Sequence, residues 1–280
     1  MKLAQKLAIS YIRTKFSLLS AISKRKAAAS AFDLFCSPQR IVKKKFPPVF
    51  KEAESLHFLL EGDTVRGWRW NKGGDKKALI VHGYESTVLN FDRYIKPLVK
   101  KGYEVLAFDA PAHGRSGGKK INAPLYKKMI LEINRQFGPL DAMIAHSFGG
   151  LAAALAMEEI NHTAKHKMVL IAPATETPTA IDSFFRFLKL DPALRDEFER
   201  IIVQKGGVSS AWYSIRRAMK HIRASVLWVH DEDDDTTPWA DAQKVKAENH
   251  PNIHFVVTSG LGHRRIYRDN KVSRTILDFL

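Results

Sequence analysis

The chain has 280 residues, 45% of them hydrophobic, which suits one large α/β domain or two small ones with a substantial core. Its single cysteine, Cys36, excludes an intramolecular disulfide and predicts a reducing, cytoplasmic location. Of the net charge of +16, most lies in the first 51 residues, which carry 12 Lys and Arg against one acid; the nearly balanced remainder is not the pattern of a nucleic-acid-binding domain.

Residues 1–50 are predicted to form a basic helical N-terminal extension. Arg13 and Lys15 interrupt its apolar stretches, so no signal-peptide core forms, and nothing in the chain approaches the ~20 apolar residues of a membrane span. On a helix, polar side chains share one stripe and apolar ones another: Lys2, Lys6, Ser10, Arg13, Ser17, Ser20 and Lys24 against Ile9, Ile12, Phe16 and Leu19. Either this helix docks on the protein, or residues 1–25 make peripheral contact with an anionic membrane.

From residue 51 on, apolar runs alternate with helical patterns. The expected strands are two around a turn within 56–70, then 77–83, 103–111, 141–147, 167–173, 224–232 and 252–260. The expected helices are 90–102, 122–138, 148–160, 238–249 and one from Arg264 to the end. Near-continuous Val, Ile and Leu runs separated by helices predict an α/β domain over 51–280, with a mostly parallel sheet covered on both faces.

The segment 174–221 interrupts this alternation. It contains no convincing strand, and its pattern predicts two or three helices inserted between strands as a helical cap. Its aromatic side chains include three candidates for substrate binding, namely Phe184, Phe185 and Trp212. They can line a ligand crevice at the ends of the strands, or they can form a small core within the cap itself.

Ser147 stands where a buried strand gives way to a helix, in the run Ala145-His146-Ser147-Phe148-Gly149. A serine at a sharp strand-to-helix turn is held out of the sheet at a helix N-terminus, and its flanking residues must be small because strand and helix pass close together. A helix cap is the simpler role for such a serine. A catalytic role requires a base and an acid that orients the base.

Suitable partners follow later strands. His263 comes just after the strand 252–260, and the acidic run "DEDDD" follows the strand 224–232. His254 lies inside its strand and His250 in a turn at a helix end, so both are interpreted as structural. Asp231, Asp233 and Asp235 have the spacing of a calcium loop, but Thr236 and Ala242 occupy positions that require glycine and glutamate, so no metal site is predicted.

These motifs together resemble an α/β-hydrolase with a serine nucleophile, near the esterase, monoacylglycerol-lipase-like and acylaminopeptidase-like branches, from about Leu56 to the end. The resemblance assigns Asp234, between His230 and Pro238, as the acid, with Asp231 as the fallback. From the run "VHGYES" it implies an oxyanion hole formed by the amides of Tyr84 and Phe148. In "FDAPAHGRSGG", His113 and Gly114 are interpreted as loop-forming.

The predicted function is therefore that of a carboxylic ester hydrolase, in which Ser147, Asp234 and His263 cleave an ester or thioester through an acyl-enzyme without cofactor or metal. Its partner would be a small-molecule substrate. Amide or peptide hydrolysis and acyl transfer are lower-ranked enzyme alternatives. A non-catalytic α/β-hydrolase scaffold, or a lipid-surface protein acting through the basic helix, is an alternative of another class.

Overall fold

The computed structural model describes residues 3–39 and 45–280, which fall into two structural units. The first, here called the helical unit, combines the described residues up to Ser37 with Glu176–Tyr213. The second, the sheet unit, holds the described residues between Pro38 and Thr175 and those from Ser214 to Leu280. Two segments far apart in the sequence therefore build one helical body.

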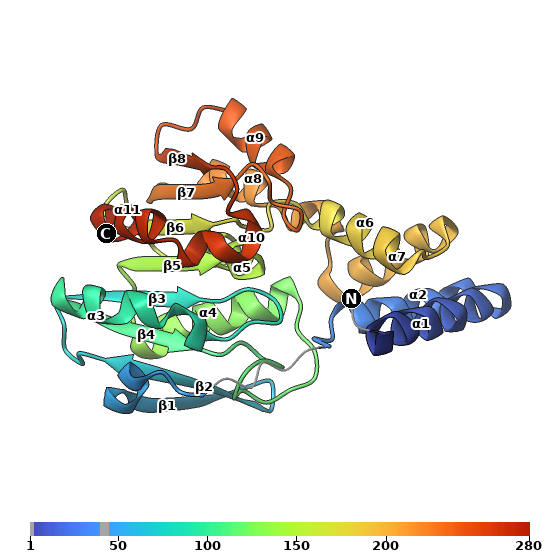
Figure 1. Cartoon of the computed structure of the whole chain (residues 1–280), viewed down its shortest axis with the longest axis horizontal. Helices are drawn as coiled ribbons and strands as arrows, with labels where there is room; N and C mark the ends of the chain where they lie inside the picture. Colours follow the sequence, from blue (N-terminus) through green and yellow to red (C-terminus); the bar gives the residue numbers. More distant parts are fainter. Residues whose placement is uncertain (1–2, 40–44) are drawn as a thin grey trace. The chain divides into compact units, whose positions relative to one another are not determined.

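The sheet unit is organised around eight strands in the order β1-β2-β4-β3-β5-β6-β7-β8 (Figure 1). The hairpin of β1 (Glu54–Leu60) and β2 (Asp63–Trp70) is antiparallel, and β2 also pairs antiparallel with β4. The remaining pairs are parallel and involve β3 (Lys76–Val81), β4 (Tyr103–Phe108), β5 (Ala142–His146), β6 (Lys167–Ile171), β7 (Ser225–Asp231) and β8 (Ile253–Thr258). The prediction of a mostly parallel sheet is confirmed.

Helices cover both faces of this sheet, as the alternation of apolar runs predicts. Along β3, Ala78 and Ile80 belong to the core beneath α3 and α11, whereas Leu79 and Val81 point to the opposite face, where Figure 1 shows α4 and α5. The helices are α3 (Asp92–Lys100), α4 (Ala123–Phe137), α5 (Phe148–Met157), α8 (Ile215–Ala218), α9 (Trp239–Ala247), α10 (Gly262–Arg265) and α11 (Asn270–Phe279).

The C-terminal tail differs from the prediction of one helix beginning at Arg264. The structure divides it into α10, a 3₁₀ turn at Ile266–Arg268, and α11. The break occurs because Asp269 has an extended backbone and caps α11, its carboxylate accepting hydrogen bonds from the amides of Lys271 and Val272. His263, expected between the strand 252–260 and a helix from Arg264, lies inside α10.

The helical unit consists of α1 (Leu3–Ile22), α2 (Lys24–Phe35), α6 (Thr177–Leu188) and α7 (Arg195–Gly206). Phenylalanine rings from α2, α6 and α7 pack edge to face in its centre: Phe35 on Phe184, Phe185 on Phe198 and Phe32 on Phe198, with centroid separations of 5.2–5.6 Å. Two of the predicted substrate-binding aromatics, Phe184 and Phe185, thus contribute to the interior of this unit.

Helix α1 buries the apolar side that the sequence identifies. Phe16 is 5% exposed, and Ile9, Ile12 and Leu19 are partly buried. The predicted polar stripe is interrupted in two ways. Arg13 is partly buried and donates to the Phe187 carbonyl, and Lys24 begins α2 because Ser23 caps that helix. Lys2 and the side chain of Lys6 lie outside the described residues.

Across residues 3–39 and 45–280, no helix combines the length and the apolar character that are required to cross a lipid bilayer.

Candidate active site

Ser147 occupies the sharp turn between β5 and α5. Its backbone angles, φ 56° and ψ −126°, lie in a region that non-glycine residues rarely adopt and that costs about 1–3 kcal/mol. The turn is held by backbone hydrogen bonds on both sides: the Ser147 amide donates to Ile171, and its carbonyl accepts from Gly150 and Ala174. The side chain makes no capping hydrogen bond, so the Ser147 hydroxyl does not cap α5.

Small residues on either side of Ser147 permit this turn. A methyl group on Gly149 would lie 2.4 Å from the carbonyl oxygen of His82, so that position admits no side chain. Ala145 is fully buried in β5, between Val81 of β3 and Leu170 of β6. Small residues are therefore required where the first turn of α5 passes the chain that leaves β3.

The imidazole of His263 reaches Ser147 across the carboxyl edge of the sheet. Its Nε2 lies 2.9 Å from Ser147 Oγ, and its Nδ1 lies 2.8 Å from a carboxylate oxygen of Asp234. Because an ionised carboxylate only accepts hydrogen bonds, Nδ1 carries the proton and Nε2 is left as an acceptor for the serine hydroxyl. All three residues are less than 9% exposed.

Asp234 is held in place from two directions. One carboxylate oxygen accepts the amides of Thr236 and Thr237, both at 2.8 Å, while the other faces His263 and accepts from the Thr237 hydroxyl. Burial alone would raise the pKa of Asp234, but the hydrogen bond and charge of His263, together with the two amides, bring this pKa below its ordinary value. The carboxyl group is therefore ionised at neutral pH.

Asp231, the alternative acid, points elsewhere. Its carboxylate accepts hydrogen bonds from the amides of Asp233, Leu261 and Gly262 and from the hydroxyl of Thr258, at 2.6–3.1 Å. Apart from Asp233, these partners lie at the end of β8 and in the segment that leads directly to His263. The geometry thus brings Asp234, and not Asp231, to the imidazole.

The loop after β3 approaches the candidate nucleophile. A methyl group on Gly83 would lie 2.9 Å from Ser147 Cβ, and the rings of Tyr84 and Phe148 have their centroids 6.1 Å apart. The Phe148 amide belongs to the first turn of α5, whose N–H groups have no intrahelical acceptor. The two residues predicted to supply oxyanion-hole amides therefore stand on segments that flank Ser147.

Two buried histidines, which the sequence did not single out as parts of the site, shape this loop. His82 Nε2 accepts the Ala110 amide and His113 Nε2 accepts the Glu85 amide, both at 2.9 Å. Each ring therefore carries its proton on Nδ1, which faces a backbone carbonyl. Burial lowers the pKa of His82 and of His113 to about 4, so both are neutral at physiological pH. This role of His113 agrees with its interpretation as loop-forming.

A third buried histidine, His146, precedes the candidate nucleophile. Its ring packs on the imidazole of His263, with centroids 4.7 Å apart, and its Nε2 lies 3.1 Å from the backbone carbonyl of the same residue. Burial, followed by the nearby charge of His263, lowers its pKa to about 3. His146 is therefore neutral and donates a hydrogen bond that holds the backbone of His263 against the turn. The only sequence signal for this role is its position next to Ser147.

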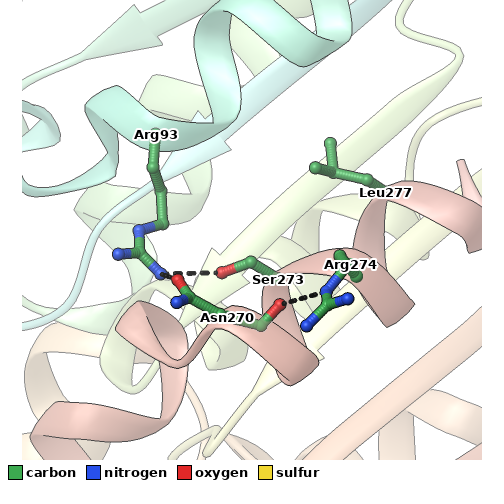
Figure 2. A pocket seen from close by; sticks show the side chains of 5 residues that line it. All are labelled: Arg93, Asn270, Ser273, Arg274 and Leu277. Carbon is green, nitrogen blue, oxygen red and sulfur yellow. Dashed lines mark hydrogen bonds between the residues drawn. The ribbon is translucent and has the colours of Figure 1, made fainter.

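A surface hollow of about 430 Å³ lies elsewhere, between α3 and α11 (Figure 2). Its lining consists of Arg93, Asn270, Ser273, Arg274 and Leu277, and none of the predicted site residues is among them. The Arg93 guanidinium is already engaged, with the Arg268 carbonyl and the hydroxyl of Ser273. Within the sheet unit, these bonds join α3 to the segment that follows His263.

Comparisons with known proteins agree with this fold. Residues 74–210 match the family described as serine aminopeptidase, S33. The chain is 22% identical over 250 residues to the uncharacterized protein YqkD of Bacillus subtilis strain 168, covering 82% of this chain and 81% of that protein. It is 28% identical over 110 residues to the uncharacterized hydrolase YugF of the same organism, covering 37% and 40%.

Solved structures show the same architecture. The Pyrococcus furiosus esterase Pf2001 aligns with a TM-score of 0.64 and 23% identity, over 88% of this chain and 97% of that one. The mouse alpha/beta hydrolase domain-containing protein 10 aligns with a TM-score of 0.58 and 16% identity, over 81% and 96%. These structures establish the fold, and the family match together with YugF supports a hydrolase.

Proposed function

We propose that this chain, which has the fold of the α/β-hydrolases, is a serine hydrolase that cleaves carboxylic esters or thioesters. The observation that carries the proposal is the hydrogen-bonded line from Ser147 through His263 to Asp234. A hydroxyl is a weak nucleophile until a neighbouring base takes its proton, and a base acts efficiently only when an acid fixes its tautomer. This line provides both conditions.

In the proposed reaction, Ser147 Oγ attacks the substrate carbonyl carbon while His263 Nε2 takes the hydroxyl proton. The amides of Tyr84 and Phe148 stabilise the negative oxygen of the tetrahedral intermediate. His263 then returns its proton to the departing alcohol or thiol, which leaves an acyl group on Ser147. Water, activated by the same imidazole, attacks this acyl group and releases the carboxylic acid. Asp234 stays ionised and stabilises the imidazolium throughout.

The decisive experiment treats the folded protein with a fluorophosphonate probe, locates the adduct by mass spectrometry and measures hydrolysis of p-nitrophenyl esters of several chain lengths. We expect the label on Ser147. In Ser147→Ala, kcat should fall at least ~10³-fold, as for removal of other serine nucleophiles. The matched control is Ser209→Ala, since Ser209 is exposed and its side chain makes no capping bond. A folded wild-type protein that takes no label would favour the non-catalytic scaffold.

A second candidate, hydrolysis of amides or peptides, is favoured by the family matched by residues 74–210, serine aminopeptidase, S33. The same three side chains would perform it, because the acyl-enzyme route is common to esters and amides. Hydrolysis of aminoacyl p-nitroanilides, measured beside that of the esters, distinguishes amide hydrolysis from ester hydrolysis. A higher kcat/KM on the anilides would make peptide hydrolysis the main activity. Adding a small alcohol and finding transesterified product would show acyl transfer.

We also infer a cytoplasmic location, from the single cysteine. As the single cysteine of the chain, Cys36 forms no intramolecular disulfide, and it is buried in the helical unit, which suits a reducing compartment where disulfides do not persist. Cell fractionation with an antibody to the protein checks this inference, and recovery from an oxidising compartment would contradict it.

A further inference from the structure

Helix α1 has a second apolar side, opposite the one that packs in the helical unit. Four large hydrophobic residues of α1 are strongly exposed: Leu7 at 63%, Tyr11 at 71%, Leu18 at 64% and Ile22 at 80%. With 3.6 residues per turn, positions 7, 11, 18 and 22 fall within one narrow stripe along the helix. These four residues are called the outer stripe below.

Single exposed hydrophobic residues are common, but a continuous row of them marks an interaction surface. The inner side of α1 already supplies what packing requires, since Phe16 is buried and its neighbours at Ile9 and Ile12 are partly so. The outer stripe is therefore surplus to the folding of the helical unit. It exposes apolar side chains to water over about four turns of α1.

The charges next to the outer stripe identify what it fits. Lys15 is exposed and stands on α1, and Lys24, Arg25 and Lys26, at the start of α2 just after Ser23, are all exposed. Among residues 7–35 the sequence has only one acid, Asp33. In α6 and α7, by contrast, three acids are paired with arginines: Asp182 and Glu199 with Arg195, and Glu197 with Arg200. Asp191, between these two helices, accepts a hydrogen bond from Ser20 and lies near Lys24.

We propose that the outer stripe binds the surface of an anionic lipid membrane, with α1 lying parallel to the surface and Lys15 and Lys24–Lys26 meeting the phosphates of the headgroups. Apolar side chains along one face, with cations at its edge, are what an interfacial helix needs. Tyr11 suits the boundary because its ring is apolar and its hydroxyl is polar. A second copy of the chain fits less well, because its own cations would face these.

The test is flotation of the full-length protein with two sets of vesicles, phosphatidylcholine alone and phosphatidylcholine with phosphatidylserine. We expect at least about tenfold more protein bound to the anionic vesicles at low salt. Most of that binding should be lost as NaCl rises from roughly 0.05 to about 0.5 M, where screening shortens to a few ångströms. Equal recovery with both sets of vesicles at low salt would overturn the proposal.

Two variants distinguish the apolar from the ionic contribution to vesicle binding. Leu7→Gln/Leu18→Gln/Ile22→Gln should reduce binding at least about tenfold, since it removes the apolar surface that enters the lipid. Lys24→Gln/Arg25→Gln/Lys26→Gln should abolish the preference for anionic vesicles. The matched control, Ser10→Gln/Thr14→Gln/Ser17→Gln, changes exposed polar positions of the same helix and should bind like wild type.

This proposal is independent of the proposed hydrolase. Ser147→Ala should bind vesicles like wild type, and the outer-stripe variant should hydrolyse a soluble p-nitrophenyl ester like wild type. Circular dichroism of each variant reports whether it folds. A wild-type protein that ignores vesicles but forms a dimer that the outer-stripe variant abolishes would overturn the proposal and assign the surface to a second copy.

Discussion

The carboxylates that follow β7 are neighbours in the sequence but take different hydrogen bonds. Asp234 faces the imidazole of His263, while Asp231 accepts hydrogen bonds from two amides and a hydroxyl of the chain that leads into His263, and from the amide of Asp233. Asp233 accepts the amide of Gly260 in the same loop. One acid therefore orients the ring, and its neighbours hold the backbone that carries it.

Replacing these acids one at a time should give different outcomes. In Asp234→Asn the imidazole loses the acceptor that fixes its tautomer, so we expect kcat to fall by about 10⁴. Asp231→Asn keeps that acceptor but loses charged hydrogen bonds to the loop, so we expect about 2 kcal/mol less stability and a much smaller fall in kcat. Ester kinetics and thermal unfolding measure both, and a larger kinetic loss in Asp231→Asn would reverse the assignment.

The buried histidines predict how stability depends on pH. The pKa of His82 and of His113 falls from 6.5 to about 4 on folding, and that of His146 falls to about 3. Below pH 6.5 these histidines therefore bind protons in the unfolded chain but stay neutral in the folded chain. Stability should be complete above pH 6.5 and should fall as the pH drops towards 4, by up to about 1.4 kcal/mol per pH unit for each histidine.

Thermal unfolding across that range measures this slope. His82→Gln should flatten the slope by removing one of the buried histidines whose pKa burial lowers, a set that also includes His230. His254→Gln is the matched control because His254 is exposed, and it should leave the slope unchanged. The carboxylates with lowered pKa, such as Asp234, lose their stabilising effect only below their unfolded pKa near 4, outside this window. A wild-type slope of zero between pH 6.5 and 4 would contradict the prediction.

At the scale of elements, the register of the strands brings the residues of the site together. Val81 pairs with Ala145 and His146 with Ile171, and Asp231 pairs with Thr258 at the far end of the sheet. Parallel strands in this register end at one edge, so the chain leaving β3, β5, β7 and β8 gathers there. The turn at Ser147 and the segments bearing Asp234 and His263 meet because their strands end together.

Substitutions in the turn around Ser147 should reduce activity more than substitutions in the strand that precedes it. Gly149→Ala places a methyl group 2.4 Å from the His82 carbonyl, so either the turn or the loop at Tyr84 must shift, and we expect at least about 10²-fold loss of kcat. Ala145→Gly is the matched change two residues before Ser147. It removes one buried methyl group and should cost about 1 kcal/mol of stability with little effect on kcat. Equal kinetic losses in the two variants would refute this account.

At the scale of the whole molecule, the helical unit joins segments that are about 140 residues apart in the sequence. Phe198 of α7 is fully buried and contacts rings from α2 and α6. The extension before residue 38 is therefore not a separate appendage of the chain. It shares its core with the segment that the sequence analysis treats as an insertion.

Removing that shared core should loosen both segments at once. Phe198→Ala should cost about 3–5 kcal/mol and should make α1 and α2 sensitive to protease as well as α7. Phe187→Ala is the control, since the Phe187 ring is 53% exposed. Limited proteolysis followed by mass spectrometry locates the cuts. Cleavage in α7 alone, with α1 and α2 protected, would show that the two segments fold independently.

Local patterns alone determined much of this protein. Apolar runs and the glycines that close helices predict the parallel sheet and its helices, because burial on both faces and helix termination leave signals within a few residues. The chain's motifs likewise single out Ser147 and His263 as candidates, and the family resemblance that they carry adds Asp234, with Asp231 as the fallback. The division of the tail at Asp269 was missed, because a cap competes with a helical pattern that is otherwise continuous.

Only the tertiary structure decided the rest, because the contacts involved join residues far apart in the sequence. It separated Asp234 from Asp231, which differ by three positions but face different partners, and it showed His82, His113 and His146 as neutral supports of the site. It also showed that α1 has a second apolar side, the outer stripe, which is exposed. A helical pattern gives the stripes on a helix, but packing alone determines which of them meets water.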